Sequence, residues 1–312
     1  MSKKVLIVAP VHEVLPNALQ DMGYTCDLRE SFTQQDAMEV AGAYEGLITS
    51  TRLQIDRAFL DKATDLKWVG RMGSGMEVID VPYATEKGVL CFSSPEGNAN
   101  AVAEQALGML LGLQHKICSA HQEMQQGIWQ REENRGLEIE GLTAAVIGFG
   151  NNGSAFARKL RAMQVQVLAL DKFKKGFAEE GIVECEDLQR IYNEADIVSF
   201  HLPLNEETRH YFNDEFVSHM VKPFVLLNLS RGSIVSQDSL YKGLKSGKVR
   251  AAGLDVWERE PVSKMEGIMQ EQYQELIRMP HVIATPHIGG YTVQALYKMS
   301  WFLAEKIRKA VH

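Results

Sequence analysis

Three glycines in the segment LTAAVIGFGNNG are spaced so that their backbone could bind a phosphate group. Gly148, Gly150 and Gly153 follow the pattern G-x-G-x-x-G, directly after an apolar stretch and directly before a stretch of helical periodicity. The first glycine of such a turn allows the bend, the second lets a pyrophosphate approach, and the third lets helix and strand pack closely. A second apolar stretch ends in Asp171, 23 residues after Gly148, where a carboxylate would accept hydrogen bonds from ribose hydroxyls. The pattern predicts a dinucleotide site that prefers NAD to NADP.

Polar side chains also lie at the ends of three other predicted strands. Arg231 follows the strand Val225–Asn228, Asp255 and Glu260 lie at and beyond the end of Ala251–Val256, and His287 follows Val282–Thr285. Ligands of open parallel sheets bind at the edge that these strand ends form. Histidine, carboxylate and arginine side chains at one edge are suited to proton transfer and to binding a small acid.

Strands and helices alternate along the whole chain, which indicates parallel sheets with crossover helices. Two long helical segments, one beginning near Asn98 and one over Thr292–Val311, would connect two domains. We therefore predict an α/β fold of two Rossmann-like or flavodoxin-like parallel-sheet domains with a cleft between them. Residues 1–100 plus 289–312 would form the substrate-binding domain, and residues 101–288 the NAD-binding domain. The remaining predicted strands are Val5–Ala9, Gly46–Thr49, Trp68–Gly70, Val89–Cys91, Thr143–Gly148, Val165–Leu170 and Ile197–Phe200.

Composition excludes several classes of protein. The chain has 312 residues, enough for two domains, and its 45% apolar and 23% charged residues are typical of globular proteins. A net charge of −7 argues against nucleic acid or an anionic membrane as the partner. No apolar run approaches the ~18 residues of a membrane span, and the N-terminus does not have the pattern of a signal peptide. Four scattered cysteines without metal-ligand spacing predict reduced thiols, no metal site and a cytoplasmic location.

Taken together, these motifs resemble those of one enzyme family. The resemblance also rests on the segments Arg71–Asp80, Pro95–Glu104, Gly127–Trp129 and His201–Leu204. In this order they are similar to the D-isomer-specific 2-hydroxyacid dehydrogenases, which include phosphoglycerate dehydrogenase and the hydroxypyruvate and glyoxylate reductases. The likeness covers nearly the whole chain. It implies an NAD-dependent enzyme that transfers a hydride between nicotinamide and C2 of a D-2-hydroxy acid or 2-oxo acid, and that forms a homodimer.

The resemblance assigns roles to individual residues. The catalytic residues fall on Arg231, Glu260 and His287, with His287 as the acid–base, Glu260 as its carboxylate partner, and Arg231 binding the substrate carboxylate. The implied cofactor-binding residues are Gly148, Phe149, Gly150, Asn151, Asn152, Gly153, Asp171, His201, Pro203, Thr208, Leu229, Ser230, Asp255 and Gly289. The implied substrate-binding residues are Ser50, Thr51, Arg52, Gly73, Ser74, Gly75, Met76 and Asn98.

The chain departs from the family pattern at several points. Asn151 and Asn152 occupy the positions of a basic and an apolar residue, so a cation near the pyrophosphate is lost. The lysines after Asp171 could weaken the preference for NAD. The stretch 262–278 is longer than usual and predicted helical, and the end of the chain at His312 implies no serine-binding regulatory domain.

Two other functions remain open on this reasoning. Some relatives are NAD(H)-responsive binding or regulatory proteins with little turnover, but such a sensor would not need Arg231, Glu260 and His287 together. An enzyme similar to alanine dehydrogenase would need a catalytic lysine and histidine in its N-terminal domain, and the sequence shows no such placement.

Overall fold

The structure is a computed structural model that describes residues 3–311. The chain forms two compact units. Unit 1 contains the residues up to Ala99 together with those from Gly290 onward, and unit 2 is the continuous stretch Asn100–Gly289. The backbone therefore passes from one unit to the other twice. None of the helices among the described residues is long and apolar enough to cross a membrane.

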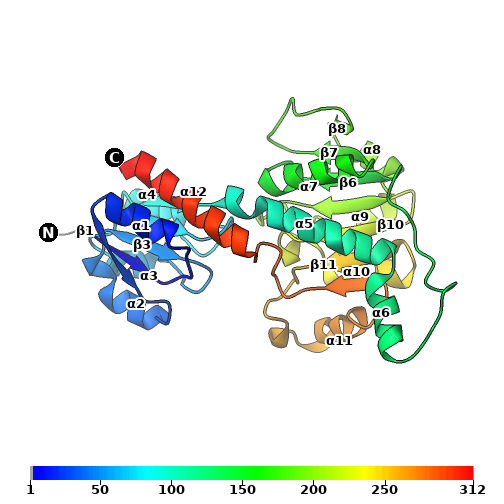
Figure 1. Cartoon of the computed structure of the whole chain (residues 1–312), viewed down its shortest axis with the longest axis horizontal. Coiled ribbons are helices and arrows are strands. Elements are labelled where there is room, and N and C mark those ends of the chain that lie inside the picture. Colours follow the sequence, from blue (N-terminus) through cyan, green and yellow to red (C-terminus); the bar gives the residue numbers. More distant parts are fainter. Residues whose placement is uncertain (1–2, 312) are drawn as a thin grey trace. The chain divides into compact units, whose positions relative to one another are not determined.

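Unit 1 is built on a parallel sheet of five strands in the order β2-β1-β3-β4-β5 (Figure 1). The long C-terminal helix α12 (Val293–Val311) packs against α1 and against β4 and β5, so the end of the chain completes the unit that the beginning started. The strands are β1 (Lys3–Ile7), β2 (Tyr24–Leu28), β3 (Gly46–Thr49), β4 (Trp68–Arg71) and β5 (Leu90–Ser93). The other helices of the unit are α1 (Val14–Asp21), α2 (Gln34–Val40), η1 (Ala41–Ala43), α3 (Arg57–Lys62) and α4 (Val81–Glu86).

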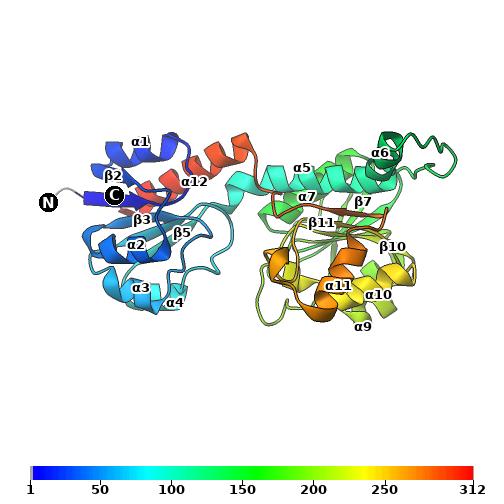
Figure 2. The same cartoon turned by 90° about the horizontal axis from the view of Figure 1, so that it is seen from below.

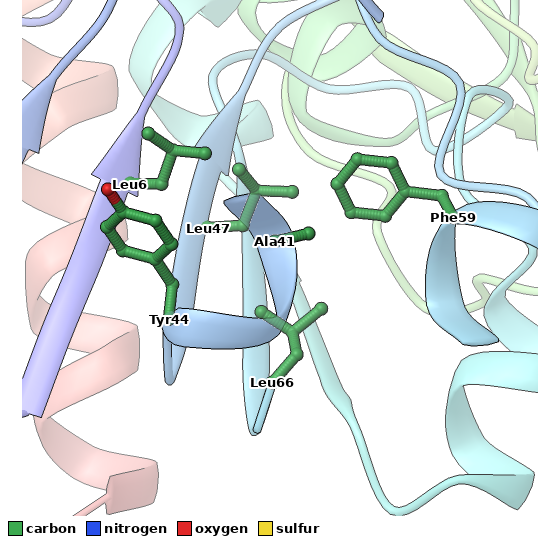
Figure 3. A pocket seen from close by; sticks show the side chains of 6 residues that line it. All are labelled: Leu6, Ala41, Tyr44, Leu47, Phe59 and Leu66. Atoms are coloured by element: carbon green, nitrogen blue, oxygen red, sulfur yellow. The ribbon is translucent and has the colours of Figure 1, made fainter. Parts of the chain in front are cut away.

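Side chains on one face of this sheet border a narrow gap that has no room for a water molecule (Figure 3). The Tyr44 hydroxyl at its border donates a hydrogen bond of 2.7 Å to Asp27 Oδ2. Burial and this carboxylate raise the pKa of Tyr44 to about 12, so the phenol stays neutral. Because the other bordering side chains are apolar, the space belongs to the hydrophobic core rather than to a binding site. They are Leu6, Ala41, Leu47, Phe59 and Leu66.

Unit 2 is built on a parallel sheet of seven strands in the order β12-β11-β10-β9-β6-β7-β8. The strand order reverses at β6, and ligands of such sheets bind at the carboxyl ends of the strands beside this point. The strands are β6 (Thr143–Ile147), β7 (Gln166–Leu170), β8 (Ile182–Cys185), β9 (Ile197–Phe200), β10 (Phe224–Asn228), β11 (Val249–Leu254) and β12 (Val282–Ala284).

Helices cover both faces of this sheet (Figure 2). Alternate residues of each strand point to opposite faces, so Ala144 and Val146 pack against α5 and α7, while Ala145 and Ile147 pack on the side of α8 to α11. Both sets are buried, which explains the continuous apolar runs of the central strands. The helices are α5 (Pro95–Gln114), α6 (Ile117–Gln125), α7 (Asn151–Ala162), α8 (Gln189–Glu194), α9 (Asp214–His219), η2 (Gly232–Ile234), α10 (Gln237–Lys245), η3 (Val262–Lys264) and α11 (Gly267–Leu276).

The predicted fold class is confirmed, because both sheets are parallel and helices connect the consecutive strands of each sheet, except β7 and β8. The sequence analysis missed two strands, β2 and β8, which lie at sheet edges. The stretch 262–278, predicted helical, contains η3 and α11.

Candidate active site

The glycine loop follows the central strand β6 and opens helix α7. Gly148 has a φ of 96°, and a Cβ on it would come within 2.5 Å of the His201 carbonyl oxygen. A Cβ on Gly153 would lie 1.9 Å from the Gly148 carbonyl oxygen, so α7 packs on the loop only because both residues are glycine. A Cβ on Gly150, by contrast, would meet no atom within 4 Å. The loop is therefore tight on its inner side and open above Gly150.

This geometry fits a pyrophosphate. Gly150 is the N-cap of the 12-residue helix α7, whose first N–H groups and dipole favour an anion. Asn152 lies in the first turn, and its buried side-chain oxygen has no hydrogen-bond partner among the described residues. Asn151 is exposed beside it. The loop thus has both the space and the donors for the phosphates of a dinucleotide.

We expect the substitution Gly150→Val to abolish dinucleotide binding without unfolding the chain. The backbone of Gly150 has a φ of −75°, which valine also adopts, and a Cβ at this position would meet no atom within 4 Å. The side chain would fill the space above the loop and weaken NADH binding by about 100-fold or more. Titration of NADH fluorescence measures the Kd, and Gly108→Val, at another open glycine of unit 2, is the matched control. Equal Kd values for the two variants would contradict this use of the loop.

Asp171 lies directly after β7 and faces the same loop. Its carboxylate accepts hydrogen bonds from the backbone N–H groups of Phe149 (2.7 Å), Phe173 (2.9 Å) and Lys174 (2.8 Å). Burial alone would raise the pKa of Asp171, but the three N–H donors outweigh it and lower the pKa. The side chain is therefore a fixed anion beside the glycine loop. The Phe149 ring stacks on Phe177 at 4.1 Å and is buried beneath the loop.

The segment after β9 lies beneath the glycine loop. His201 Nε2 is 2.8 Å from Ser199 Oγ, and burial lowers the pKa of His201 to about 4, so the ring is neutral. The Thr208 hydroxyl donates to the Pro203 carbonyl oxygen at 2.6 Å and closes the turn between them. Neither His201 nor Thr208 is therefore placed to act as an acid or a base.

Arg231 follows β10 in a turn that Asn228 organises. The fully buried Asn228 accepts hydrogen bonds from the N–H and hydroxyl of Ser230 and donates one of 3.0 Å to the Arg231 carbonyl oxygen. Leu229 is buried in the core and Ser230 is buried beside it, so contacts of this turn with a ligand would involve mainly backbone. The Arg231 guanidinium donates to the Ser230 carbonyl oxygen at 2.8 Å.

His287 and Glu260 form a hydrogen-bonded pair. His287 Nδ1 lies 2.7 Å from Glu260 Oε2, and the other carboxylate oxygen of Glu260 accepts the Trp257 N–H at 2.9 Å. The hydrogen bond with Glu260 raises the pKa of His287 against burial and the charge of Arg231, which lower it. Burial raises the pKa of Glu260, but its two hydrogen bonds and the charge of Arg231 outweigh burial and lower it. The three predicted catalytic residues therefore act on one another's charge.

Asp255 holds the loop that carries His287. Its buried carboxylate accepts the N–H groups of Ile288 (2.8 Å) and Gly289 (2.7 Å), the Thr285 hydroxyl, and the Gln105 amide at 3.1 Å. The His287 N–H also donates to the Asp255 carbonyl oxygen at 2.8 Å. These bonds maintain the left-handed backbone of His287, whose φ is 58°. Asp255 therefore positions the histidine.

Sequence reasoning missed Gln105 and Thr285 in this network. The Gln105 amide also donates to the Thr285 hydroxyl at 2.8 Å, so it links helix α5 to the end of β12. The sequence gives no sign of this link, because the two residues are 180 positions apart. Only the fold brings α5 next to the strand ends.

In unit 1, the predicted substrate-binding residues follow the neighbouring strands β3 and β4. Gly73 has a φ of 132°, and its carbonyl oxygen accepts the Ser94 N–H at 2.9 Å, while Ser74 and Gly75 are partly exposed. The Arg71 guanidinium covers the Cα of Gly73 so closely that a Cβ there would lie 1.7 Å from it. The side chain of Met76 packs partly against the core.

The other predicted substrate residues of unit 1 differ in their surroundings. Ser50, Thr51 and Arg52 form the loop after β3, and the Arg52 guanidinium donates to the Glu30 carbonyl oxygen. Asn98 lies in the first turns of α5, and its side chain packs directly on Gly290. Its buried amide oxygen has no partner among residues 3–311.

Known proteins resemble this chain over most of its length. Residues 107–289 match the NAD binding domain of the D-isomer specific 2-hydroxyacid dehydrogenases. The hydroxypyruvate reductase of Thermotoga maritima is 33% identical over 280 residues, which cover 90% of this chain and 89% of that protein. The D-3-phosphoglycerate dehydrogenase of Methanocaldococcus jannaschii is 31% identical over 99% of this chain, which spans 57% of that protein's length.

A solved structure agrees with these sequences. The D-lactate dehydrogenase of Aquifex aeolicus, complexed with NAD and lactic acid, superposes with a TM-score of 0.82 at 26% identity and covers 99% of this chain and 95% of its own. NAD is also the dinucleotide that the matched domain is known to bind. On this evidence the chain belongs to the family of D-isomer-specific 2-hydroxyacid dehydrogenases.

Proposed function

We propose that this protein is an NAD-dependent oxidoreductase that transfers a hydride between nicotinamide and C2 of a D-2-hydroxy acid or 2-oxo acid. The observation that carries the proposal is the hydrogen-bonded pair of His287 and Glu260 within the electrostatic reach of Arg231. The pair combines an acid–base with the carboxylate that orients it, in the unit that also contains the glycine loop.

In the reductive direction His287 supplies the proton. The bond to Glu260 occupies Nδ1 and leaves Nε2 as the nitrogen that exchanges a proton with the substrate. When bound, NADH supplies the hydride that adds to C2. The protonated His287 then gives its Nε2 proton to the oxygen of the 2-oxo group, which becomes the hydroxyl. In the oxidative direction neutral His287 takes up that proton.

In this proposal Arg231 binds the acid in unit 2, and the Gly73–Met76 loop is the substrate-binding segment that the family resemblance assigns to unit 1. The guanidinium of Arg231 has the planar pair of donors that matches a carboxylate, and its charge also polarises the 2-oxo group. The backbone N–H groups of Ser74, Gly75 and Met76, in the partly exposed part of the loop, are further donors for a carboxylate. The other residues assigned from the family, Ser50 to Arg52 and Asn98, would contact the remainder of the substrate.

Among substrates we place 3-phosphoglycerate, or hydroxypyruvate and glyoxylate, first. The support is the naming of relatives that are 29–33% identical, including the glyoxylate reductase of Thermococcus litoralis. The test is NADH consumption with hydroxypyruvate, glyoxylate, pyruvate, 2-oxoglutarate and 3-phosphohydroxypyruvate. Turnover of one of these acids supports the proposal. No turnover, with NADH binding intact by fluorescence, would favour an NAD(H)-responsive binding protein instead.

We expect the substitution Glu260→Gln to narrow the pH range of reduction from its alkaline side. Reduction needs protonated His287, and Glu260 raises the pKa of His287, so the imidazolium persists to higher pH. A neutral amide removes this support, and the alkaline limb of the kcat profile moves to lower pH. The profile measured from pH 5 to 10 tests this, with Glu275→Gln as a surface control. If the alkaline limb of the kcat profile did not move, Glu260 would not set the pKa of His287.

We also propose a homodimer formed through the region after α5. Five large apolar side chains on α6 and the loop that follows it are exposed, and Trp129 is 74% exposed. Exposed large apolar side chains that gather on one segment are typical of a protein interface. The five are Ile117, Met124, Ile128, Trp129 and Leu137.

We expect the double substitution Ile128→Ser/Trp129→Ser to convert the dimer into monomers, because it removes apolar area from the interface. Sedimentation velocity measures the change. Phe173→Ser, which alters an even more exposed apolar residue of the same unit, should leave the dimer intact. A dimer that survives the double substitution would place the interface elsewhere.

A cytoplasmic location completes the proposal. The four cysteines are free thiols, and burial raises the pKa of Cys26 to about 11, which keeps it unreactive. Free thiols are usual in a reducing compartment. Fractionation of the cells that make the protein tests the location.

A further inference from the structure

A second histidine–glutamate pair lies two residues from Glu260. His210 Nε2 is 2.6 Å from Glu258 Oε1, and only 17% of the Glu258 side chain is exposed. His210 has a left-handed backbone with a φ of 52°, a conformation that only a few per cent of residues other than glycine adopt. The functions proposed above give this pair no role. A strained histidine on a half-buried carboxylate therefore needs an explanation.

Glu258 connects three segments of unit 2. Its second carboxylate oxygen accepts the N–H of Gln237, the first residue of α10, at 2.9 Å. Its carbonyl oxygen accepts the Ser233 hydroxyl at 3.3 Å, and the Ser233 carbonyl oxygen accepts the His210 N–H at 2.7 Å. The three contacts among His210, Ser233 and Glu258 form a closed ring, and the bond from the Gln237 N–H attaches α10 to it. We call these four residues the Glu258 clamp.

The clamp lies between two of the proposed catalytic residues. Gly232 follows Arg231 directly, and a Cβ on Gly232 would lie 1.7 Å from the Trp257 carbonyl oxygen and 2.6 Å from the Glu258 nitrogen. The backbone after Arg231 is thus pressed against the backbone that leads to Glu260. The turn from Trp257 to Glu260 is closed by the bond from the Trp257 N–H to the Glu260 carboxylate. A substitution at Glu258 therefore affects both the turn that carries Arg231 and the turn that carries Glu260.

We propose that His210 and Glu258 are positioning residues that hold the Arg231 turn against the turn that presents Glu260 to His287. This inference rests on the proposed function. The side chain of Glu260 can meet His287 only if its turn is fixed, and the charge of Arg231 acts on the pair at a distance that the same clamp sets. Displacements of about 1 Å in such arrangements reduce rates by up to ~10²-fold.

The test measures the pKa of His287 in the protein without cofactor or substrate, because this pKa depends on the position of Glu260. Histidine is labelled with ¹⁵N, and the ring signals are followed by NMR across the pH range. The signal of His287 is identified by its loss in His287→Asn. The charged groups that act on His287 are Glu260, Asp255 and Arg231, so a loosened Glu260 turn lowers its pKa toward the ordinary value.

Two substitutions open the clamp from opposite sides. His210→Gly removes the imidazole and suits the left-handed backbone, while Glu258→Ala removes the carboxylate. We expect both to lower the pKa of His287 and to reduce kcat/KM for the 2-oxo acid by about tenfold, with the Kd for NADH unchanged. Glu258→Gln keeps an acceptor for the Gln237 N–H and should restore part of both values. Glu275→Ala, at a surface carboxylate paired with Lys245, is the matched control and should change neither.

The outcomes separate this inference from the proposed function. An unchanged pKa of His287 in His210→Gly and Glu258→Ala, with normal melting temperatures, would overturn the clamp. Should Glu258→Ala fail to fold, His210→Gly and Glu258→Gln decide by the same measurement. A lowered pKa in a protein that reduces none of the 2-oxo acids would leave the clamp standing and reject the enzyme.

Discussion

Replacing His287 with alanine should lower kcat for reduction of the 2-oxo acid by about 10³-fold, within the 10²–10⁴-fold that positioned acid–base groups contribute. The variant loses the proton donor and leaves Glu260 without its partner at 2.7 Å. The glycine loop and Asp171 are untouched, so the Kd for NADH should not change. Stopped-flow or steady-state absorbance of NADH measures the rate, and fluorescence titration measures the Kd.

Another histidine of unit 2 serves as the control for this experiment. His121 is exposed on α6, where its ring lies 3.1 Å from the Gln125 side-chain nitrogen, and His121→Ala should retain full activity. If His287→Ala kept a kcat within a few-fold of the wild type, the proton would have to come from another group. In that case the assignment of His287 as the acid–base would be wrong.

Replacing Arg231 with alanine should lower kcat/KM for the acid by about 10³-fold, because truncating one partner of a buried charge pair costs 2–5 kcal/mol or more. Arg231→Lys should restore little of this loss, since an ammonium group lacks the planar pair of donors that matches a carboxylate. The alanine variant also removes a cation that lowers the pKa of His287, so the alkaline limb of its pH profile should move to higher pH. Kinetics across a pH series measure both effects.

Arg190 provides the control for loss of a cation. It pairs with Glu194 on the surface of α8, and surface pairs of this kind contribute little. Arg190→Ala should therefore change neither kcat/KM nor the pH profile. If Arg231→Ala weakened only the binding of NADH, the guanidinium would bind the cofactor and not the acid.

The central strands could be predicted because burial on both faces of the sheet requires apolar residues along the whole strand. Strands buried on both faces, such as β6 and β10, are continuous apolar runs. The edge strands β2 and β8 were missed because only one residue of β2 and two of β8 are fully buried, and sequences such as YTCDL show neither an apolar run nor a clear alternation. Pairing with β1 and β7 stabilises these segments as strands, and that pairing is not encoded locally.

The candidate site also contains residues that could be predicted from the sequence and residues that could not. The glycine loop is a local feature, since one turn and its flanking elements specify it, and Arg231, Glu260 and His287 could be named because each follows a recognisable strand. Gln105 and Thr285 could not, because their contact joins α5 to a distant strand end. His210 and Glu258 were missed for the same reason, being 48 residues apart and typical of surface positions.

The continuity of unit 2 has a consequence for how such enzymes diversify. One uninterrupted stretch of chain, Asn100–Gly289, contains the glycine loop, Asp171 and all three proposed catalytic residues, whereas unit 1 is assembled from both ends of the sequence. A gene segment that encodes this stretch would carry the cofactor loop and the proposed catalytic residues into another protein in a single recombination event. Changes in the flanking segments, which form unit 1, would then alter which acid is bound. The residues proposed for hydride and proton transfer would be inherited together.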